Sequence, residues 1–162
     1  MLELRPITAA DAPPLLSLLS DPQVAVWLRP HGVTERFTLQ ECAAFARRDT
    51  AHWEAHGFGT SIAWQDDTCV GWSLLRHSIV AGRGEVEIGW TVARARWGAG
   101  IGTSLGAYAI DIAGRHGVTE VVAFTRVDNR ASRRVMGKLG MSYERDFPHA
   151  GYPHALYRSR GS

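Results

Sequence analysis

The spacing of apolar residues along the chain changes between a period of two and a period near 3.6, which predicts alternating strands and helices. The predicted strands are residues 2–7, 58–64, 69–79, 84–92, 118–125, 141–147 and 155–158. The predicted helices are residues 9–19, a short one from 22, a longer one from 39, then 100–115 and 129–139. The order β-α-α-α-β-β-β-α-β-α-β-β predicts an α/β protein with one mixed, mostly antiparallel sheet flanked by helices.

Local signals mark several element ends. Thr38 followed by Glu41 forms a capping box for the third helix, and Gly140 follows the last helix. Apolar residues at helical spacing from Leu39 onward predict the buried face of that third helix. The turn-forming residues 148–151 predict a hairpin near the C-terminus.

Length and composition limit the class of protein. A length of 162 residues predicts one domain, residues 1–162, with a proper core. A hydrophobic share of 45% argues against disorder, and a net charge of +2 argues against a nucleic-acid partner. Because no stretch approaches the ~20 apolar residues of a bilayer span, we expect no membrane partner. Two cysteines make no disulfide framework, which favours a reducing, cytoplasmic location.

Residues 90–105 combine the end of a strand, a short basic turn, three glycines and the start of a helix. Glycines let the backbone approach a ligand, and the first N–H groups of a helix are unpaired donors at its positive end. The segment therefore predicts a phosphate or pyrophosphate site. The dinucleotide pattern G-x-G-x-x-G fails, because its last position is Thr103 or Leu105, and the Walker A pattern fails because no lysine follows.

Three segments carry a resemblance to a known family. They are Glu85-Val86-Glu87-Ile88-Gly89-Trp90, Trp97-Gly98-Ala99-Gly100-Ile101-Gly102, and Asn129 to Met141 with Ser132, Lys138 and Gly140. In order and spacing they resemble the E-I-G-Y/W strand, the Q/R-x-x-G-x-G/A loop and the N-x-x-S-x-x-x-x-x-K-x-G-F helix of the RimJ/RimL-like Gcn5-related N-acetyltransferases. Trp97 and Met141 depart from the usual residues, and neither departure touches the backbone donors.

This resemblance implies the acyl-CoA N-acyltransferase fold, acetyl-CoA as cosubstrate without a metal, and direct attack by a primary amine in a ternary complex. It implies Glu87 as general base or as a residue that only orients the substrate, and Ser132 as the group that protonates the leaving thiolate. The implied cofactor contacts are Trp90, Thr91, Val92, Trp97, Gly98, Ala99, Gly100, Ile101, Gly102, Thr103, Asn129, Ser132 and Arg134. The implied acceptor contacts are Trp27, His31, Glu85 and Tyr152.

Several of these residues also have a plain structural interpretation. Glu87 equally fits an exposed glutamate on a strand, and Asn129 with a serine three residues later fits a helix N-cap. His52 and His56 share a helix face, but no third ligand is apparent in the sequence. We therefore expect a solvated helix face there instead of a zinc site.

The acceptor stays open at this stage. A protein N-terminal amine, such as that of a ribosomal protein, follows from the branch, and a small amine such as an antibiotic or polyamine is the second choice. A non-catalytic CoA-binding module and a nucleotide-binding regulator are the alternatives of another class. Dimers are common in the family, so a homodimer is also open.

Overall fold

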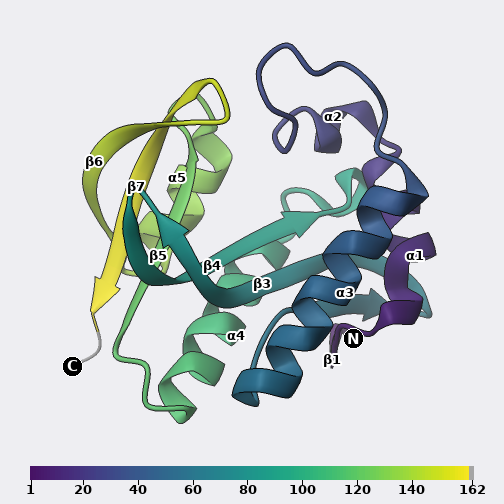
Figure 1. The fold of residues 1–162 in the computed structure, drawn as a ribbon, viewed down its shortest axis with the longest axis horizontal. Helices are drawn as coiled ribbons and strands as arrows, with labels where there is room; N and C mark the ends of the chain where they lie inside the picture. The colour runs from purple at the N-terminus through teal and green to yellow at the C-terminus, as the bar shows by residue number, and fades with distance from the viewer. Residues whose placement is uncertain (161–162) are drawn as a thin grey trace.

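The computed structural model describes residues 1–160 and has the predicted order of elements, with two added 3-10 turns (Figure 1). The strands are β1 (Glu3–Pro6), β2 (Ser61–Gln65), β3 (Thr68–Val80), β4 (Arg83–Val92), β5 (Glu120–Arg126), β6 (Ser142–His149) and β7 (Tyr152–Arg160). The helices are α1 (Ala12–Leu19), α2 (Pro22–Ala25), α3 (Leu39–His56), α4 (Ile101–Arg115) and α5 (Arg130–Lys138), and the 3-10 turns are η1 (Ala9–Asp11) and η2 (Arg94–Arg96).

A single seven-stranded sheet runs in the order β1-β2-β3-β4-β5-β7-β6, which confirms the predicted mixed sheet. Every neighbouring pair is antiparallel except β4 and β5, which are parallel. Within the described residues the ladder between these two strands consists of one pair, Glu87 with Val122. Beyond that pair the two strands diverge toward their C-terminal ends (Figure 1). The sheet therefore opens into a wedge between β4 and β5.

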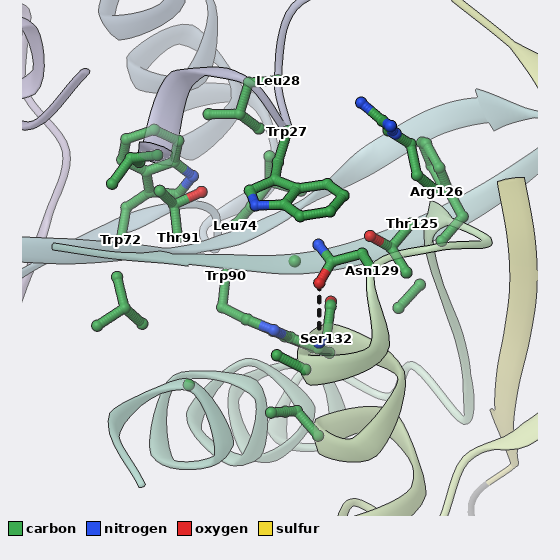
Figure 2. A pocket seen from close by; sticks show the side chains of 18 of the residues that line it. Trp27, Leu28, Trp72, Leu74, Trp90, Thr91, Thr125, Arg126, Asn129 and Ser132 are labelled. Carbon is green, nitrogen blue, oxygen red and sulfur yellow. Dashed lines mark hydrogen bonds between the residues drawn. The ribbon is translucent and has the colours of Figure 1, made fainter. Parts of the chain in front are cut away.

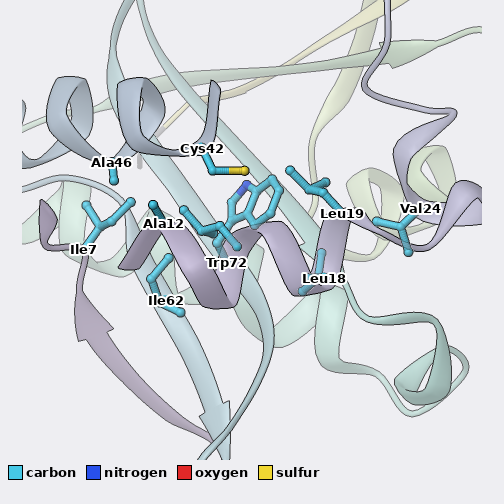
Figure 3. Packing of buried hydrophobic residues seen from close by; sticks show 10 residues of the cluster. Ile7, Ala12, Leu18, Leu19, Val24, Cys42, Ala46, Ile62 and Trp72 are labelled. Carbon is cyan, nitrogen blue, oxygen red and sulfur yellow. The ribbon is translucent and has the colours of Figure 1, made fainter. Parts of the chain in front are cut away.

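Helices cover both faces of the sheet, because neighbouring strand residues point to opposite sides. On β2, Ile62 packs with α1 and α3, whereas Ala63 packs with α4. Figure 3 shows the first of these clusters, in which Cys42 of α3 lies against Trp72 of β3. The wedge is thus held between two packed layers.

Helix α3 confirms its predicted start but not its whole predicted face. The Thr38 side chain accepts the N–H of Glu41, and the Glu41 carboxylate accepts the N–H of Thr38. Leu39, predicted to be buried, is 50% exposed, so that expectation was wrong. The buried residue that the apolar pattern missed is Asp49, which is only 1% exposed.

Two predicted boundaries also shift. The strand predicted from Phe58 begins at Ser61, although Phe58 itself is buried. The first helix begins as the 3-10 turn η1, where Thr8 caps the chain as its sequence position predicts. Among the described residues, no helix is both long enough and apolar enough to cross a membrane. Cys42 is buried, Cys69 is partly buried, and both are free thiols.

Candidate active site

A cleft of about 990 Å³ lies in the wedge and is lined by β3, β4, β5, the loop before α4, and helix α5 (Figure 2). At its other end it reaches α1, α3 and the loop that follows α2. Its lining joins segments from both halves of the chain. A volume of this size is at the upper end of the usual range for ligand sites in proteins.

The glycine loop takes the conformation that its composition predicts. Gly98 and Gly100 have left-handed φ angles of 79° and 80°, and Gly100 is the N-cap of α4. The indole N–H of Trp97 donates to the Val92 carbonyl at 2.8 Å and ties the loop to the end of β4. Helix geometry leaves the amides of residues 101–103 without an intrahelical acceptor, so they form an anion site at the cleft.

Helix α5 begins with the predicted cap. Asn129 Oδ1 accepts the backbone N–H of Ser132 at 3.2 Å, and both side chains line the cleft (Figure 2). Four basic residues from η2 and α5 also line it: Arg96, Arg130, Arg134 and Lys138. An anionic ligand on the glycine loop would lie among these cations.

The carboxylate of Glu87 lies where the wedge begins, because Glu87 is the β4 member of the single β4–β5 pair. Glu87 is 8% exposed, and its Oε2 lies 3.5 Å from Arg76 Nε. Arg76 Nη1 in turn donates to Asp49 Oδ1 at 3.2 Å. Asp49 Oδ2 accepts the Thr60 hydroxyl at 2.7 Å. A chain of ionic contacts thus connects the buried face of α3 with the head of the cleft.

The opposite end of the cleft is bridged by stacked side chains. The Arg126 guanidinium lies 4.9 Å from the ring centroid of Trp27 and 3.9 Å from that of Tyr152. The His31 N–H donates to the Ala150 carbonyl at 2.8 Å, so the backbones on the two sides also meet. We call this contact the Arg126 bridge. It joins the loop after α2 to β5 and to the β6–β7 hairpin.

An ion pair also orders the loop after α2. Arg29 donates to both carboxylate oxygens of Glu41, at 2.6 and 3.0 Å, and stacks 3.7 Å from the ring centroid of Phe37. These hydrogen bonds from Arg29 lower the pKa of Glu41 to about 2. The loop side of the cleft is therefore fixed to the start of α3.

The structure brings most of the predicted site residues together at this cleft. Of the predicted cofactor contacts all but Ala99 line it, together with Glu87, Trp27 and Tyr152. His31 lies outside the lining, with its ring edge-on to Tyr152 at 5.0 Å.

Glu85 is not part of the cleft lining. Both of its carboxylate oxygens accept hydrogen bonds from Arg158 at 2.9 Å. These bonds, with those that Arg158 donates to the Glu144 carboxylate, raise the pKa of Arg158 above its ordinary value. Glu85 is held on the closed side of the β4–β5 pair, and its carboxylate is already paired. The contact of Glu85 with the acceptor stays a prediction.

Sequence reasoning missed Arg76 and the buried Asp49. The sequence does contain a sign of Arg76, because it is a charged residue within the otherwise mainly apolar run 69–80. Its partner is 27 positions earlier on a helix, at a separation that no local pattern connects. Sequence reasoning gave Arg126 no role of its own, because its stacking depends on side chains from three separate elements.

The mixed sheet with its wedge, and the glycine loop at the start of α4, define the acyl-CoA N-acyltransferase class. A family model described as "Acetyltransferase (GNAT) domain" matches residues 1–142. The chain belongs to this family of acetyltransferases, enzymes that acetylate amines.

Solved structures share the fold at low identity. An acetyltransferase of the GNAT family from Bacillus anthracis has a TM-score of 0.73 at 23% identity, covering 98% of this chain and 94% of that chain. A ribosomal-protein alanine acetyltransferase from Vibrio fischeri has a TM-score of 0.78 at 15% identity, covering 99% and 93%. A ribosomal-protein α-N-acetyltransferase, RimL, in complex with coenzyme A has a TM-score of 0.79 at 18% identity, covering 99% and 94%.

Proposed function

We propose that residues 1–162 act as one N-acetyltransferase domain that transfers the acetyl group of acetyl-CoA to an α-amine at a protein N-terminus. The observation that carries the proposal is the wedge, with an anion site at one wall and the Glu87 carboxylate at its head. The two free thiols fit the reducing, cytoplasmic compartment in which we place the enzyme.

The cofactor side of the proposal rests on charge and geometry. The pyrophosphate of acetyl-CoA would accept hydrogen bonds from the amides of residues 98–103, at the positive end of α4. Arg134 and Lys138 would reach the adenosine 3′-phosphate from α5, which lies next to α4. The pantetheine arm would lie along residues 90–92, where β4 has left its parallel neighbour and its backbone is available for hydrogen bonds.

In the proposed reaction the amine attacks the thioester carbonyl directly, and no covalent enzyme intermediate forms. Glu87 accepts a proton from the ammonium or amine, directly or through water, so that the nitrogen lone pair attacks. A backbone N–H at the end of β4 polarises the carbonyl, and the new C–N bond forms as the C–S bond breaks. Ser132 donates its hydroxyl proton to the thiolate, which leaves as the free thiol of coenzyme A. The serine then regains a proton from water, and Glu87 releases to water the proton that it took from the amine.

Arg76 acts in this proposal as a positioning residue. Its guanidinium holds Glu87 Oε2 from one side and is itself held by Asp49. Because Asp49 is fixed in turn by the buried Thr60 hydroxyl, the carboxylate of Glu87 is placed by a rigid chain. Such support is what keeps a reacting group within reach of its substrate.

The acceptor is the less determined part. Structural relatives that include ribosomal-protein acetyltransferases support a protein α-amine. The Arg126 bridge favours a slender acceptor, which an extended N-terminus and a small amine both provide. A small-molecule amine is therefore the second candidate.

The first test is binding of acetyl-CoA, measured as a rise in melting temperature. The Gly102→Glu variant should lose this rise, because it places bulk and negative charge at the first turn of α4. A Cβ on Gly102 meets no atom closer than 3.5 Å, so the first side-chain carbon fits there, and the melting temperature without ligand checks that the variant folds. Gly114→Glu, on the same helix with open space around it, is the matched control and should keep the rise. An unchanged response in Gly102→Glu contradicts the proposed pyrophosphate site.

Turnover is tested separately by thiol release from acetyl-CoA with N-terminal peptides and with a panel of small amines. Peptide-dependent release supports the α-amine, and release only with small amines moves the function to the second candidate. If no acceptor causes thiol release while acetyl-CoA still binds, the protein is a non-catalytic CoA-binding module. Glu87→Gln should lower kcat more than it weakens acetyl-CoA binding, and an unchanged kcat removes Glu87 from the mechanism.

A further inference from the structure

Three histidines meet at a surface separate from the cleft. His52 and His56 lie one turn apart on α3, and His77 comes from β3, so the fold supplies the third residue that the sequence did not show. One ligand atom from each lies within 4.8 Å of the others. Their ring centroids are 4.4, 4.5 and 5.5 Å apart.

The ring of His52 is oriented by hydrogen bonds at both nitrogens. Its Nδ1–H donates to the Phe58 carbonyl at 2.9 Å, an outer contact of the kind that fixes histidine ligands in metal sites. Its Nε2 therefore carries the lone pair, which accepts the backbone N–H of His77 at 2.9 Å.

His56 and His77 are exposed and reach an ion from solvent without any change in the core. Imidazole nitrogens are ligands for zinc, copper and nickel, whereas calcium and magnesium take oxygen. Three imidazoles therefore favour a transition-metal ion over calcium or magnesium.

We propose that His52, His56 and His77 bind one divalent transition-metal ion of the zinc, copper or nickel type, with water completing the coordination. The side chains of His56 and His77 capture the ion, and His52 Nε2 becomes the third ligand. When the ion binds, His52 Nε2 no longer accepts the backbone N–H of His77. That N–H then donates to water, because it lies at the outer edge of β3 beside an exposed side chain. The bound ion clamps the end of α3 to β3.

The test uses untagged protein freed of metal with a chelator, because an affinity tag of histidines binds the same ions. Calorimetric titration with zinc chloride at pH 7.5 should show one ion per chain, with binding saturated at an ion concentration on the order of 100 µM. Zinc should raise the melting temperature and excess chelator should reverse the rise, whereas magnesium chloride should have no effect. Absence of stoichiometric zinc binding overturns the proposal.

Variants identify the ligands. His56→Ala and His77→Ala should each weaken zinc binding about tenfold or more, and both should keep the metal-free melting temperature because the side chains are exposed. His31→Ala, which removes an exposed histidine elsewhere, should bind zinc as the wild type does. His52→Ala should also weaken binding. Zinc affinity that is unchanged in His52→Ala, or in both variants of the exposed histidines, refutes the three-histidine site.

Discussion

The buried carboxylate of Asp49 offers the sharpest test of the contacts behind the cleft. Asp49→Ala removes the acceptor of the Thr60 hydroxyl, which is fully buried, and one partner of Arg76, whose side chain is 20% exposed. The third partner, Arg48, is 57% exposed at its side chain, so water replaces its contact. The cost is therefore carried by Thr60 and Arg76.

The magnitude follows from these exposures. The Thr60 hydroxyl still accepts the N–H of Leu75 in this variant, but its own O–H loses its acceptor. A buried donor without an acceptor costs roughly 1–3 kcal/mol, and the lost partner of Arg76 adds about 1 kcal/mol. The sum, about 2–4 kcal/mol, approaches the ~3–5 kcal/mol that breaking a buried ion pair from one side costs. For a chain of this length that loss lowers the melting temperature by about 4–16 °C.

Urea unfolding followed by the fluorescence of the six tryptophans measures this loss. Arg48→Ala is the matched control, because it removes a partner of the same carboxylate at the surface, and we expect less than about 0.5 kcal/mol. A double-mutant cycle between Asp49→Ala and Arg76→Ala should give a coupling energy of at least about 1 kcal/mol. Additive losses, or an Asp49→Ala cost similar to that of the control, would refute the reasoning.

Three further outcomes are expected. Gly151→Ala places a Cβ 2.7 Å from that of His31 at a left-handed φ, so it should loosen the Arg126 bridge and raise the KM of the acceptor without changing acetyl-CoA affinity; an unchanged KM contradicts this. Gly106→Ala places a Cβ 2.4 Å from the Leu139 Cδ1 atom and should cost about 1–3 kcal/mol of stability in urea unfolding. Burial lowers the pKa of His52 below its unfolded value near 6.5, so in metal-free buffer its contribution to stability is present above that value and is lost as pH falls through the folded pKa. His52→Ala should flatten this part of the stability–pH curve, and an unchanged slope would show that another group causes it.

The sequence predicts the fold well wherever the signal is local. The capping box at Thr38 and the N-cap at Asn129 are set by a few neighbouring residues, and both are confirmed. Residues 84–92 are likewise predicted to form a strand, and the structure has β4 at Arg83–Val92.

The remaining features depend on contacts between distant residues. Arg158 donates to the Glu85 carboxylate from 73 positions later in the chain, a contact that the pattern of a single strand does not reveal. Glu85 was therefore predicted as an acceptor contact without knowledge that its carboxylate is paired. Asp49 interrupts an apolar face because Arg76, a partner on another element, makes a buried charge tolerable there. His77 joins His52 for the same reason: the contact exists only once α3 lies along the edge of β3.

The single ladder pair between β4 and β5 divides the sheet into two sub-sheets that share very little backbone. One contains β1 to β4 and the other β5 to β7, and the Arg158–Glu85 ion pair is a side-chain strap across the seam. A ligand lying in the wedge touches both sub-sheets and so acts as a cross-link between them. Binding of a ligand in the cleft should therefore hold the two sub-sheets together more firmly. When the cleft is filled, the amides of β5 and β7 should gain hydrogen-exchange protection together with those of β4.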